Sequence, residues 1–455
     1  MEIEKQLVDY ISRARYEDLP VEITDLTKNF FLNILGSTIA GALMEGSETL
    51  ANQVMDWNGK KEATILLYGS RVPAHNAAFI KSYMARALDV DDGIRPGMHV
   101  GAATVPAALA ASELAAGCTG RDIITAVAVG AEVADRINLV SKYDGFDPTG
   151  VCSIFAASAA AGRILGLNFD QMWHALAIAF NKSGGSFQSN REGALSVRLI
   201  QGFAAQGGII SSQLAGKGFT GPKDFLQGVY GYFHLFARDK YDAQAVVGEL
   251  GKRFEFSKTM FKKYPSCGST IASTEAILDL VNEHADITPD NISHVHIKVT
   301  PYTYKIVGSP FQIGDNPRVN AQFNIQYCVA NAILRKSSKL AHFEEPQIKE
   351  PEIMQIIKKI EVEADPDLDK RDETAVEMRV ITSDGKEYHK NIDIAAGFPP
   401  RHLTSEELLE RFWSCVDYAQ KPLERKNVDK IVSLVRRLED VRDIRSLIPL
   451  LVWPK

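Results

Sequence analysis

The first 255 residues carry apolar positions at helical spacing. Helices are predicted over residues 29–44, 74–88, 104–117, 122–137, 151–167, 170–180 and 199–216. The segment 151–167 consists largely of Ala, Gly and Ser. Because small side chains let neighbouring helices approach closely, this helix is expected to cross the centre of the helical part. Gly117, Gly166 and Gly218 follow periodic stretches, as is typical of helix ends.

The pattern changes to strand periodicity between residues 256 and 400. In the sequence HVHIKVT (294–300) every second residue is apolar, which predicts a strand with one buried face. Residues 357–363 and 375–383 look similar, and the Asp-Gly dipeptide at 384–385 predicts a hairpin turn. Helices are predicted at about 268–283, 320–336 and 350–356, so this part reads as a smaller α/β domain.

The chain becomes helical again after residue 401. Thr404 and Glu407 form a capping box before an apolar-periodic segment, and residues 427–447 are amphipathic. A helical tail after an α/β insert is expected to pack back on the first domain. The predicted fold class is therefore α plus α/β, with residues 1–255 and 401–455 forming a large helical domain and residues 256–400 an inserted smaller α/β domain.

Composition and charge exclude several classes of protein. Of the 455 residues, 45% are hydrophobic and 24% are charged, with a net charge of −6 and no long run of like charge. These values exclude a disordered chain and argue against a nucleic-acid partner or a basic membrane anchor. The N-terminal segment lacks the basic start and apolar run of a signal peptide, and no apolar stretch is long enough to span a membrane. The five cysteines lie far apart, which favours reduced thiols and a cytoplasmic location.

The segment ALDVDDGIRPGMH (87–99) concentrates charged residues at a predicted helix end. These residues are Asp89, Asp91, Asp92, Arg95 and His99. Clustered carboxylates repel one another, so the pKa of one is expected to rise, and a His beside them can be tuned as an acid or a base. The Pro-Gly dipeptide at 96–97 would turn the His back toward the acids. From the residues alone, a solvated loop with helix caps is favoured over a catalytic site and a metal site.

Two further segments carry candidate binding groups. In FKKYPSCGST (261–270), Lys262 and Lys263 can hold carboxylates, and Cys267 is either a nucleophile or, as favoured here, a structural thiol. Arg191 opens a loop before a helix, where it makes either a bidentate contact to a substrate carboxylate or a surface salt bridge. His294 and His296 share a strand face, and a solvated face is favoured over a metal pair.

Five motifs together resemble the MmgE/PrpD family over nearly the whole chain. They lie at 87–110, 145–167, 191–222, 261–270 and 320–334. The resemblance implies a large all-helical domain made of both termini and an inserted α/β lid, with the site between the two domains. It also implies a homodimer and catalysis on small carboxylic acids without a metal or an organic cofactor. Members of the family include dehydratases, decarboxylases and an epimerase.

The resemblance also implies roles for individual residues. His99 would be the acid/base, and Asp89, with Asp92 or Asp91 nearby, would orient it or serve as the partner base. Lys262 would bind a carboxylate and stabilise enediolate charge, and Tyr327 would donate a proton or a hydrogen bond. The chain departs from the family pattern at several positions, and at three of them Asp147, Val197 and Ile200 replace a His, a Lys and a His. Asp147 is a candidate replacement base. The expected substrate-binding residues are Asp92, Arg95, Arg191, Lys263 and Cys267.

The expected function is that of a cofactor-independent lyase. It would move a proton at carbon next to a carboxylate of a small acid, with dehydration or decarboxylation. An epimerase that uses His99 and Asp147 on opposite faces is the alternative, and a non-catalytic family member that binds a small acid is a further one. Because Val197 and Ile200 make one wall apolar, a substrate less charged than a tricarboxylate is expected.

Overall fold

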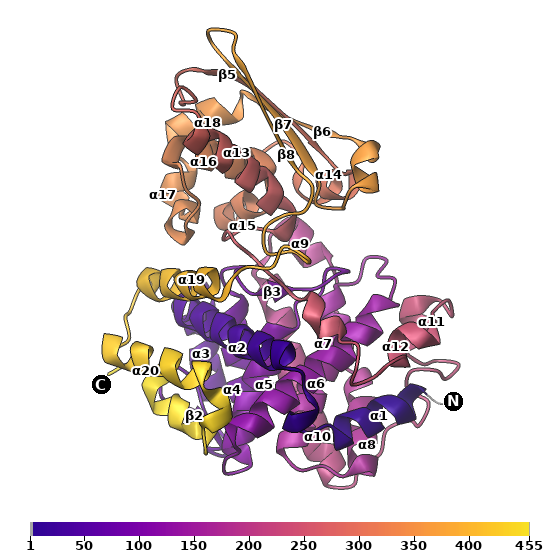
Figure 1. Ribbon diagram of the computed structural model, residues 1–455. Helices are drawn as coiled ribbons and strands as arrows, with labels where there is room; N and C mark the ends of the chain where they lie inside the picture. The colour runs from indigo at the N-terminus through magenta and orange to yellow at the C-terminus, as the bar shows by residue number, and fades with distance from the viewer. Residues whose placement is uncertain (1–2, 455) are drawn as a thin grey trace. The chain divides into compact units, whose positions relative to one another are not determined.

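The computed structural model describes residues 3–454 and divides into two compact units (Figure 1). The first unit comprises Met1–Thr259 and Leu408–Lys455, and the second comprises Met260–Glu407. The observed breaks lie a few residues beyond the predicted ones at 255 and 400. Among the described residues, no helix combines the length and apolar character that a membrane crossing requires.

The first unit is mainly helical but not entirely so. Two short antiparallel strands, β1 (Ala63–Thr64) and β2 (Arg71–Val72), correct the expectation of an all-helical domain. The short strand β3 (Asp92–Gly93) and part of α19 (Ser405–Tyr418) also belong to this unit. Its other helices are α1 (Ile3–Arg13), α2 (Val21–Gly41), α3 (Ser47–Asp56), α4 (Ala74–Arg86), α5 (Gly101–Leu114), α6 (Gly120–Leu139), α7 (Pro148–Ile164), α8 (Phe169–Phe180), α9 (Gln188–Glu192), α10 (Leu199–Gly216), α11 (Tyr232–Ala237), α12 (Ala243–Val247) and α20 (Arg425–Arg436).

Helix α7 occupies the centre of the first unit, as its small residues predicted. It packs against α5, α6, α8 and α10, and its residues from Pro148 to Gly162 are buried. A Cβ added to Gly130 of α6 would lie 2.7 Å from the carbonyl oxygen of Ala156, and one added to Gly208 of α10 would lie 2.6 Å from the Cβ of Ala157. The close approach of these three helices therefore depends on glycine at both positions.

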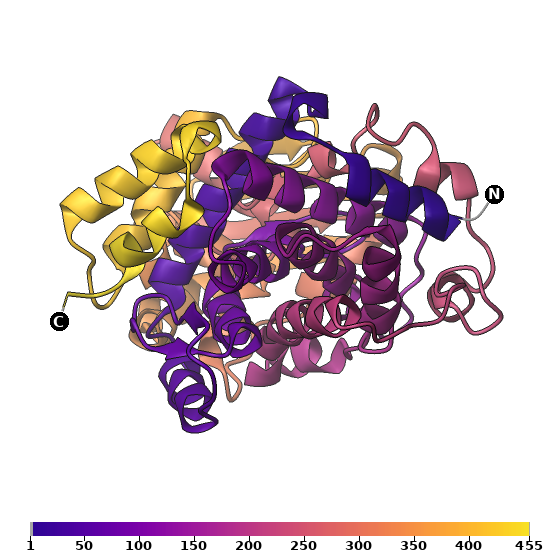
Figure 2. The ribbon, with the colours of Figure 1, turned by 90° about the horizontal axis from the view of Figure 1, so that it is seen from below.

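The C-terminal elements belong to the first unit. Helix α20 packs against α2. Figure 2 shows the C-terminal elements, in yellow, beside the indigo helix α2. The expected packing of the tail on the helical part is confirmed. However, the predicted helix over 427–447 is too long, because α20 ends at Arg436 and is followed by the 3-10 helices Leu438–Asp440 and Ile444–Leu451. The Asp443 side chain accepts a hydrogen bond from the Arg445 N–H and begins the last of these.

The second unit is built on a four-stranded mixed sheet in the order β6-β5-β7-β8. Strand β5 (Ile292–Val299) is parallel to β6 (Ile360–Ala364) and antiparallel to β7 (Val376–Thr382), which is antiparallel to β8 (Glu387–Ile392). Sheet residues join one hydrophobic core with α13 (Ile271–Glu283) and α16 (Ile325–Arg335). The remaining elements are α14 (Pro301–Val307), α15 (Pro317–Gln322), α17 (Glu345–Ile348), α18 (Pro351–Ile357) and the short strand β4 (Met260–Phe261).

The predicted strand signals are confirmed with small shifts. Val295, Ile297 and Val299 are fully buried, whereas His294 and His296 pair with Glu361 and Glu363 on the other face. The Asp-Gly turn closes the β7–β8 hairpin, since the Thr382 N–H donates to the Lys386 carbonyl at 3.0 Å. The strand predicted at 357–363 begins only at Ile360, because α18 extends to Ile357.

Candidate active site

The acidic loop begins where helix α4 ends, and it is held by two arginines. Arg86, the last residue of α4, forms an ion pair with Asp89 and lies 3.5 Å from an oxygen of Asp91. Arg411 of α19 donates to the carbonyl oxygen of Val90. The carboxylates raise the pKa of Arg86, which therefore stays charged although it is buried. The loop is thus a buried charged cluster and not the solvated loop that the residues alone favoured.

Asp92 anchors the start of helix α5. Its carboxylate is fully buried and accepts hydrogen bonds at 3.1 Å from the backbone N–H groups of Val100 and Gly101. A Cβ at position 101 would lie 2.2 Å from this carboxylate, so only glycine allows the contact. Burial and the nearby Asp91 charge raise the pKa of Asp92 to about 7. Both oxygens are turned inward to the helix start, and the role of Asp92 in binding substrate stays a prediction.

A tight turn brings His99 back to the acids, as the Pro-Gly dipeptide predicted. Ile94 and Met98 exchange backbone hydrogen bonds of 2.8 and 2.9 Å, and Gly97 at the turn has φ +67°. The Nδ1 atom of His99 lies 2.5 Å from the carbonyl oxygen of Asp92 and 3.6 Å from a carboxylate oxygen of Asp91.

The carbonyl contact fixes the tautomer of the His99 ring. A carbonyl oxygen only accepts hydrogen bonds, so Nδ1 carries the proton and Nε2 of the neutral ring is the basic nitrogen. The side chain of His99 is 20% exposed, whereas that of Asp91 is fully buried. The ring therefore offers Nε2 for proton transfer, and the carboxylate behind Nδ1 stabilises the imidazolium form.

His99 is also held through its backbone by the start of helix α7. Its N–H donates to Oγ1 of Thr149 at 3.0 Å. Asp147 caps α7, because Oδ1 accepts from the Thr149 N–H at 2.8 Å and Oδ2 accepts from Nδ2 of Asn190 at 2.8 Å. Both oxygens of Asp147 are therefore engaged in local structure. The role of Asp147 as a replacement base stays a prediction, and it would require the carboxylate to release one of these contacts.

The residues that replace the family Lys and His form apolar surface near the start of α7. Val197 and Ile200 are buried, and a Cβ added to Gly150 would lie 2.8 Å from Cγ2 of Ile200. The neighbouring Arg198 is buried and donates to the carbonyl oxygen of Glu45. The predicted carboxylate-binding residues Arg95 and Arg191 are exposed.

The other predicted site residues belong to the second unit. Lys262, next to β4, is almost completely buried, whereas Lys263 is exposed and lies 3.5 Å from a carboxylate oxygen of Glu407. Cys267 is half-buried, and its carbonyl oxygen accepts from the N–H and the hydroxyl of Thr270. It is a free cysteine at the start of a short 3-10 helix, which fits the favoured structural reading.

Tyr327 lies in the hydrophobic core of the second unit. Its side chain is fully buried between Phe311 and Phe343, with ring centroids 5.3 and 5.5 Å away. Its hydroxyl donates to the carbonyl oxygen of His342. Donation from Tyr327 to a substrate stays a prediction, and it would require the hydroxyl to leave this backbone carbonyl.

Two residues of the site, Arg86 and Thr149, were not predicted as site residues, although their signals are present in the sequence. Asp91, one of the acids offered as a partner of His99, lies 3.6 Å from Nδ1 of the ring, and Asp89 pairs with Arg86. Arg86 stands three residues before Asp89, a spacing at which helical side chains meet. Thr149 follows an Asp-Pro dipeptide, a pattern typical of a capped helix start. Which of the three acids faces the ring was set by the turn.

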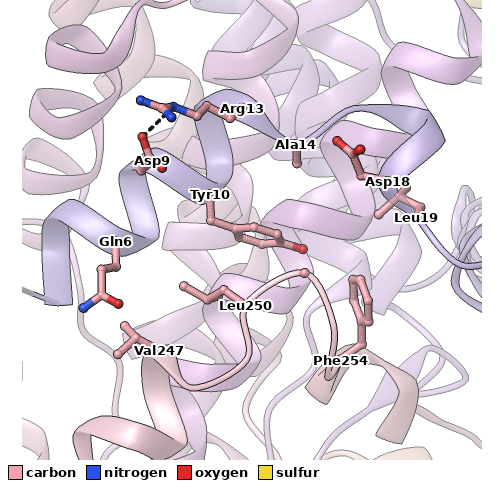
Figure 3. Close-up of a pocket in the computed structure, with 11 residues that line it drawn as sticks. Gln6, Asp9, Tyr10, Arg13, Ala14, Asp18, Leu19, Val247, Leu250 and Phe254 are labelled. Carbon is pink, nitrogen blue, oxygen red and sulfur yellow. Dashed lines mark ion pairs between the residues drawn. The ribbon is translucent and has the colours of Figure 1, made fainter.

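No group of three or more His, Cys, Asp and Glu side chains within residues 3–454 is arranged to hold a metal ion. A pocket of about 410 Å³ lies elsewhere in the first unit (Figure 3). It contains none of the predicted site residues. The pocket is lined by Gln6, Asp9, Tyr10, Arg13, Ala14, Asp18, Leu19, Val247, Leu250, Gly251 and Phe254.

Comparison with known proteins places the chain in a family. The profile of the MmgE/PrpD N-terminal domain matches residues 5–244, and that of the MmgE/PrpD C-terminal domain matches residues 264–438. The chain belongs to the MmgE/PrpD family.

Its curated relatives include cis-aconitate decarboxylases from a fungus and from mammals. The Aspergillus terreus enzyme is 24% identical, covering 99% of this chain and 96% of the relative. The Homo sapiens enzyme is 26% identical, covering 94% and 90%, and the Mus musculus enzyme is 26% identical, covering 84% and 80%.

Proposed function

We propose that the protein is a lyase that acts on a small carboxylic acid by proton transfer at a carbon next to a carboxylate. The observation that carries this proposal is the contact between Nδ1 of His99 and the carbonyl oxygen of Asp92, which makes Nε2 the basic nitrogen of the neutral ring. Membership of the MmgE/PrpD family and relatives named cis-aconitate decarboxylase support decarboxylation or dehydration as the reaction.

In this proposal His99 is the group that moves the proton. In dehydration, Nε2 would take the proton from the carbon, and the imidazolium would give it to the hydroxyl that leaves as water. In decarboxylation, the carbon–carbon bond breaks with loss of carbon dioxide, and the imidazolium would protonate the carbanion that remains and then regain a proton from solvent. The buried carboxylate of Asp91, 3.6 Å from Nδ1, stabilises the imidazolium. The positive charge of Arg86 offsets the negative charge of the acids. General acid–base catalysis of this kind contributes roughly 10²- to 10⁴-fold to a rate.

The substrate is proposed to be a small acid with an apolar portion. Its carboxylates would be bound by cations such as the exposed Arg95 and Arg191. Val197 and Ile200 provide no charge where the family pattern has a Lys and a His, and desolvating a carboxylate against them would cost several kcal/mol. Mono- and dicarboxylates are therefore preferred to tricarboxylates.

The epimerase alternative has less support. It requires a second base opposite His99, and Asp147 was the residue predicted for that role. Both carboxylate oxygens of Asp147 accept hydrogen bonds within the α7 start, from Thr149 and Asn190. A base that caps a helix would have to give up that contact in each turnover, so elimination remains the proposed reaction.

The test is proton NMR of the purified protein in D₂O with a panel of small acids. The panel contains cis-aconitate, hydroxy and unsaturated mono- and dicarboxylates, and amino dicarboxylates, each with and without a chelator. We expect elimination products from a mono- or dicarboxylate, deuterium at the reacting carbon, and the same rate with chelator. Inversion without elimination would favour the epimerase, and folded protein that binds acids without exchanging a proton would contradict both enzyme assignments.

A further inference from the structure

A chain of polar side chains runs from the core of the first unit to the turn that carries His99. Asn138, in the last turn of α6, is fully buried. Its Nδ2 donates to the carbonyl oxygen of Arg95 at 3.2 Å, and its Oδ1 accepts from the hydroxyl of Tyr143 at 2.8 Å. One buried amide thus connects the outer end of the Ile94–Met98 turn to the α6–α7 segment.

The hydrogen-bond partners of Asn138 determine the orientation of its side-chain amide. The hydroxyls of Tyr143 and Tyr232 lie 3.1 Å apart, and that of Tyr232 lies 3.0 Å from Oγ of Ser141. Burial raises the pKa of both tyrosines, so both keep their protons. Tyr143 donates to Oδ1 of Asn138. A flipped Asn138 would set its oxygen against the carbonyl oxygen of Arg95, so the network selects the donor orientation.

We propose that Asn138 and Tyr143 are positioning residues that hold the Arg95 end of the turn and thereby fix the ring of His99 on the carbonyl oxygen of Asp92. The kinetic part of this inference rests on the proposed function, whereas the structural part does not. Neither residue is assigned to the reaction itself. They act through the backbone of a turn whose two ends are Asp92 and His99.

The geometry explains why the turn depends on this support. The carbonyl oxygen of Asp92 and the ring of His99 meet only if the six residues from Gly93 to Met98 stay folded back. The Ile94–Met98 pair closes the base of the turn, and Thr149 holds the N–H of His99. Arg95 and Pro96 at the outer end are exposed, so the bond from Asn138 holds that end against solvent competition.

The decisive variant is Asn138→Asp. It preserves size and the acceptor for Tyr143 but replaces the donor to Arg95 with an oxygen. We expect kcat to fall about 10- to 100-fold with KM changed less than about twofold, as for a small displacement of a reacting group. Tyr143→Phe keeps the Asn138 side chain and removes the hydroxyl that orients it, so it should lose activity in the same direction but by less.

The matched control is Asn331→Asp in α16 of the second unit. Asn331 is also fully buried, its Nδ2 donates to the carbonyl oxygen of Ser337 at 3.3 Å, and its Oδ1 accepts from Arg335. We expect this variant to lose thermal stability without a selective loss of kcat. Equal loss of kcat in the two Asp variants at equal Tm would overturn the positioning role.

A second measurement does not depend on the enzyme assignment. Long-range proton–nitrogen NMR of protein labelled at histidine nitrogens reports the tautomer of each ring, and His99→Gln assigns the His99 signals. We expect the Nδ1-protonated form in the native protein and a mixture of tautomers in folded Asn138→Asp. If the tautomer is the same in both, the inference is overturned. If it changes but no acid is turned over by the native protein, the inference stands and the proposed function fails.

Discussion

The Nδ1 atom of His99 lies 2.5 Å from the carbonyl oxygen of Asp92, seven residues earlier in the chain. The same Asp92 uses its carboxylate to cap helix α5, so one residue orients the ring with its backbone and anchors the following helix with its side chain. This dual use explains why the loop is buried, and it makes the chemistry of His99 sensitive to groups that do not touch a substrate.

Asp91→Asn tests the charge behind the ring. The carboxylate of Asp91 lies 3.6 Å from Nδ1 of His99, and Asp89 would still pair with Arg86 in the variant. We expect kcat to fall about 10- to 100-fold at unchanged KM, because the imidazolium loses its counter-charge. Steady-state kinetics on the acid found in the NMR panel checks this. A variant with native kcat would show that Asp91 serves only the fold.

Asp92 gives the protein a stability that depends on pH. Its pKa is raised from an ordinary 3.8 to about 7, so between pH 4 and pH 7 the folded state binds a proton that the unfolded state has lost. The contribution of Asp92 to stability therefore falls as pH rises through that range. We expect Asp92→Asn, relative to the native protein, to be more stable at pH 8 than at pH 5, as measured by urea unfolding. The opposite trend would refute the raised pKa.

Asp147→Ser separates a helix cap from a catalytic base. Serine caps a helix about as well as aspartate but does not act as a carboxylate base. We expect activity within a few-fold of the native value and a change in the free energy of unfolding well below 1 kcal/mol, whereas Asp147→Ala should cost about 1 kcal/mol. Loss of turnover in a folded Asp147→Ser variant would restore Asp147 as a base and favour the epimerase.

Tyr327→Phe tests whether the hydroxyl of that tyrosine serves the fold or the reaction. The variant keeps the packing on Phe311 and Phe343 and removes the hydroxyl that donates to His342. We expect a loss of about 1–3 kcal/mol in the free energy of unfolding, since a buried carbonyl loses its donor, and a native kcat. Thermal unfolding and kinetics on the same preparation check both values. A large drop in kcat at native stability would mean that the hydroxyl serves the reaction.

The sequence predicted the mainly helical and α/β character of the two parts because periodicity is a local signal. The small residues of α7 indicated its central position, and the Asp-Gly dipeptide indicated the β7–β8 turn. Periodicity did not predict that the helix over 427–447 would end at Arg436, because this end depends on a change to 3-10 geometry after that residue.

Within the candidate site, the sequence identified the loop but not the role of each aspartate. Three aspartates in four residues are equivalent by composition, and only the fold assigns Asp89 to Arg86, Asp91 to His99 and Asp92 to the α5 start. Tyr327 and Asp147 were predicted from the family pattern, which marks a position but not the partner of the side chain. The partners come from distant segments, at His342 and Asn190.

The most direct test of the account is the His99→Gln variant in the NMR assay. Glutamine preserves polarity and approximate size but cannot exchange a proton at neutral pH. We expect a rate loss of at least about 100-fold on every acid that the native protein turns over. A Tm close to the native value would show that the variant is folded. A folded variant that retains more than about a tenth of the native rate, well short of the loss expected for an acid–base residue, would contradict the role of His99 and the function proposed from it.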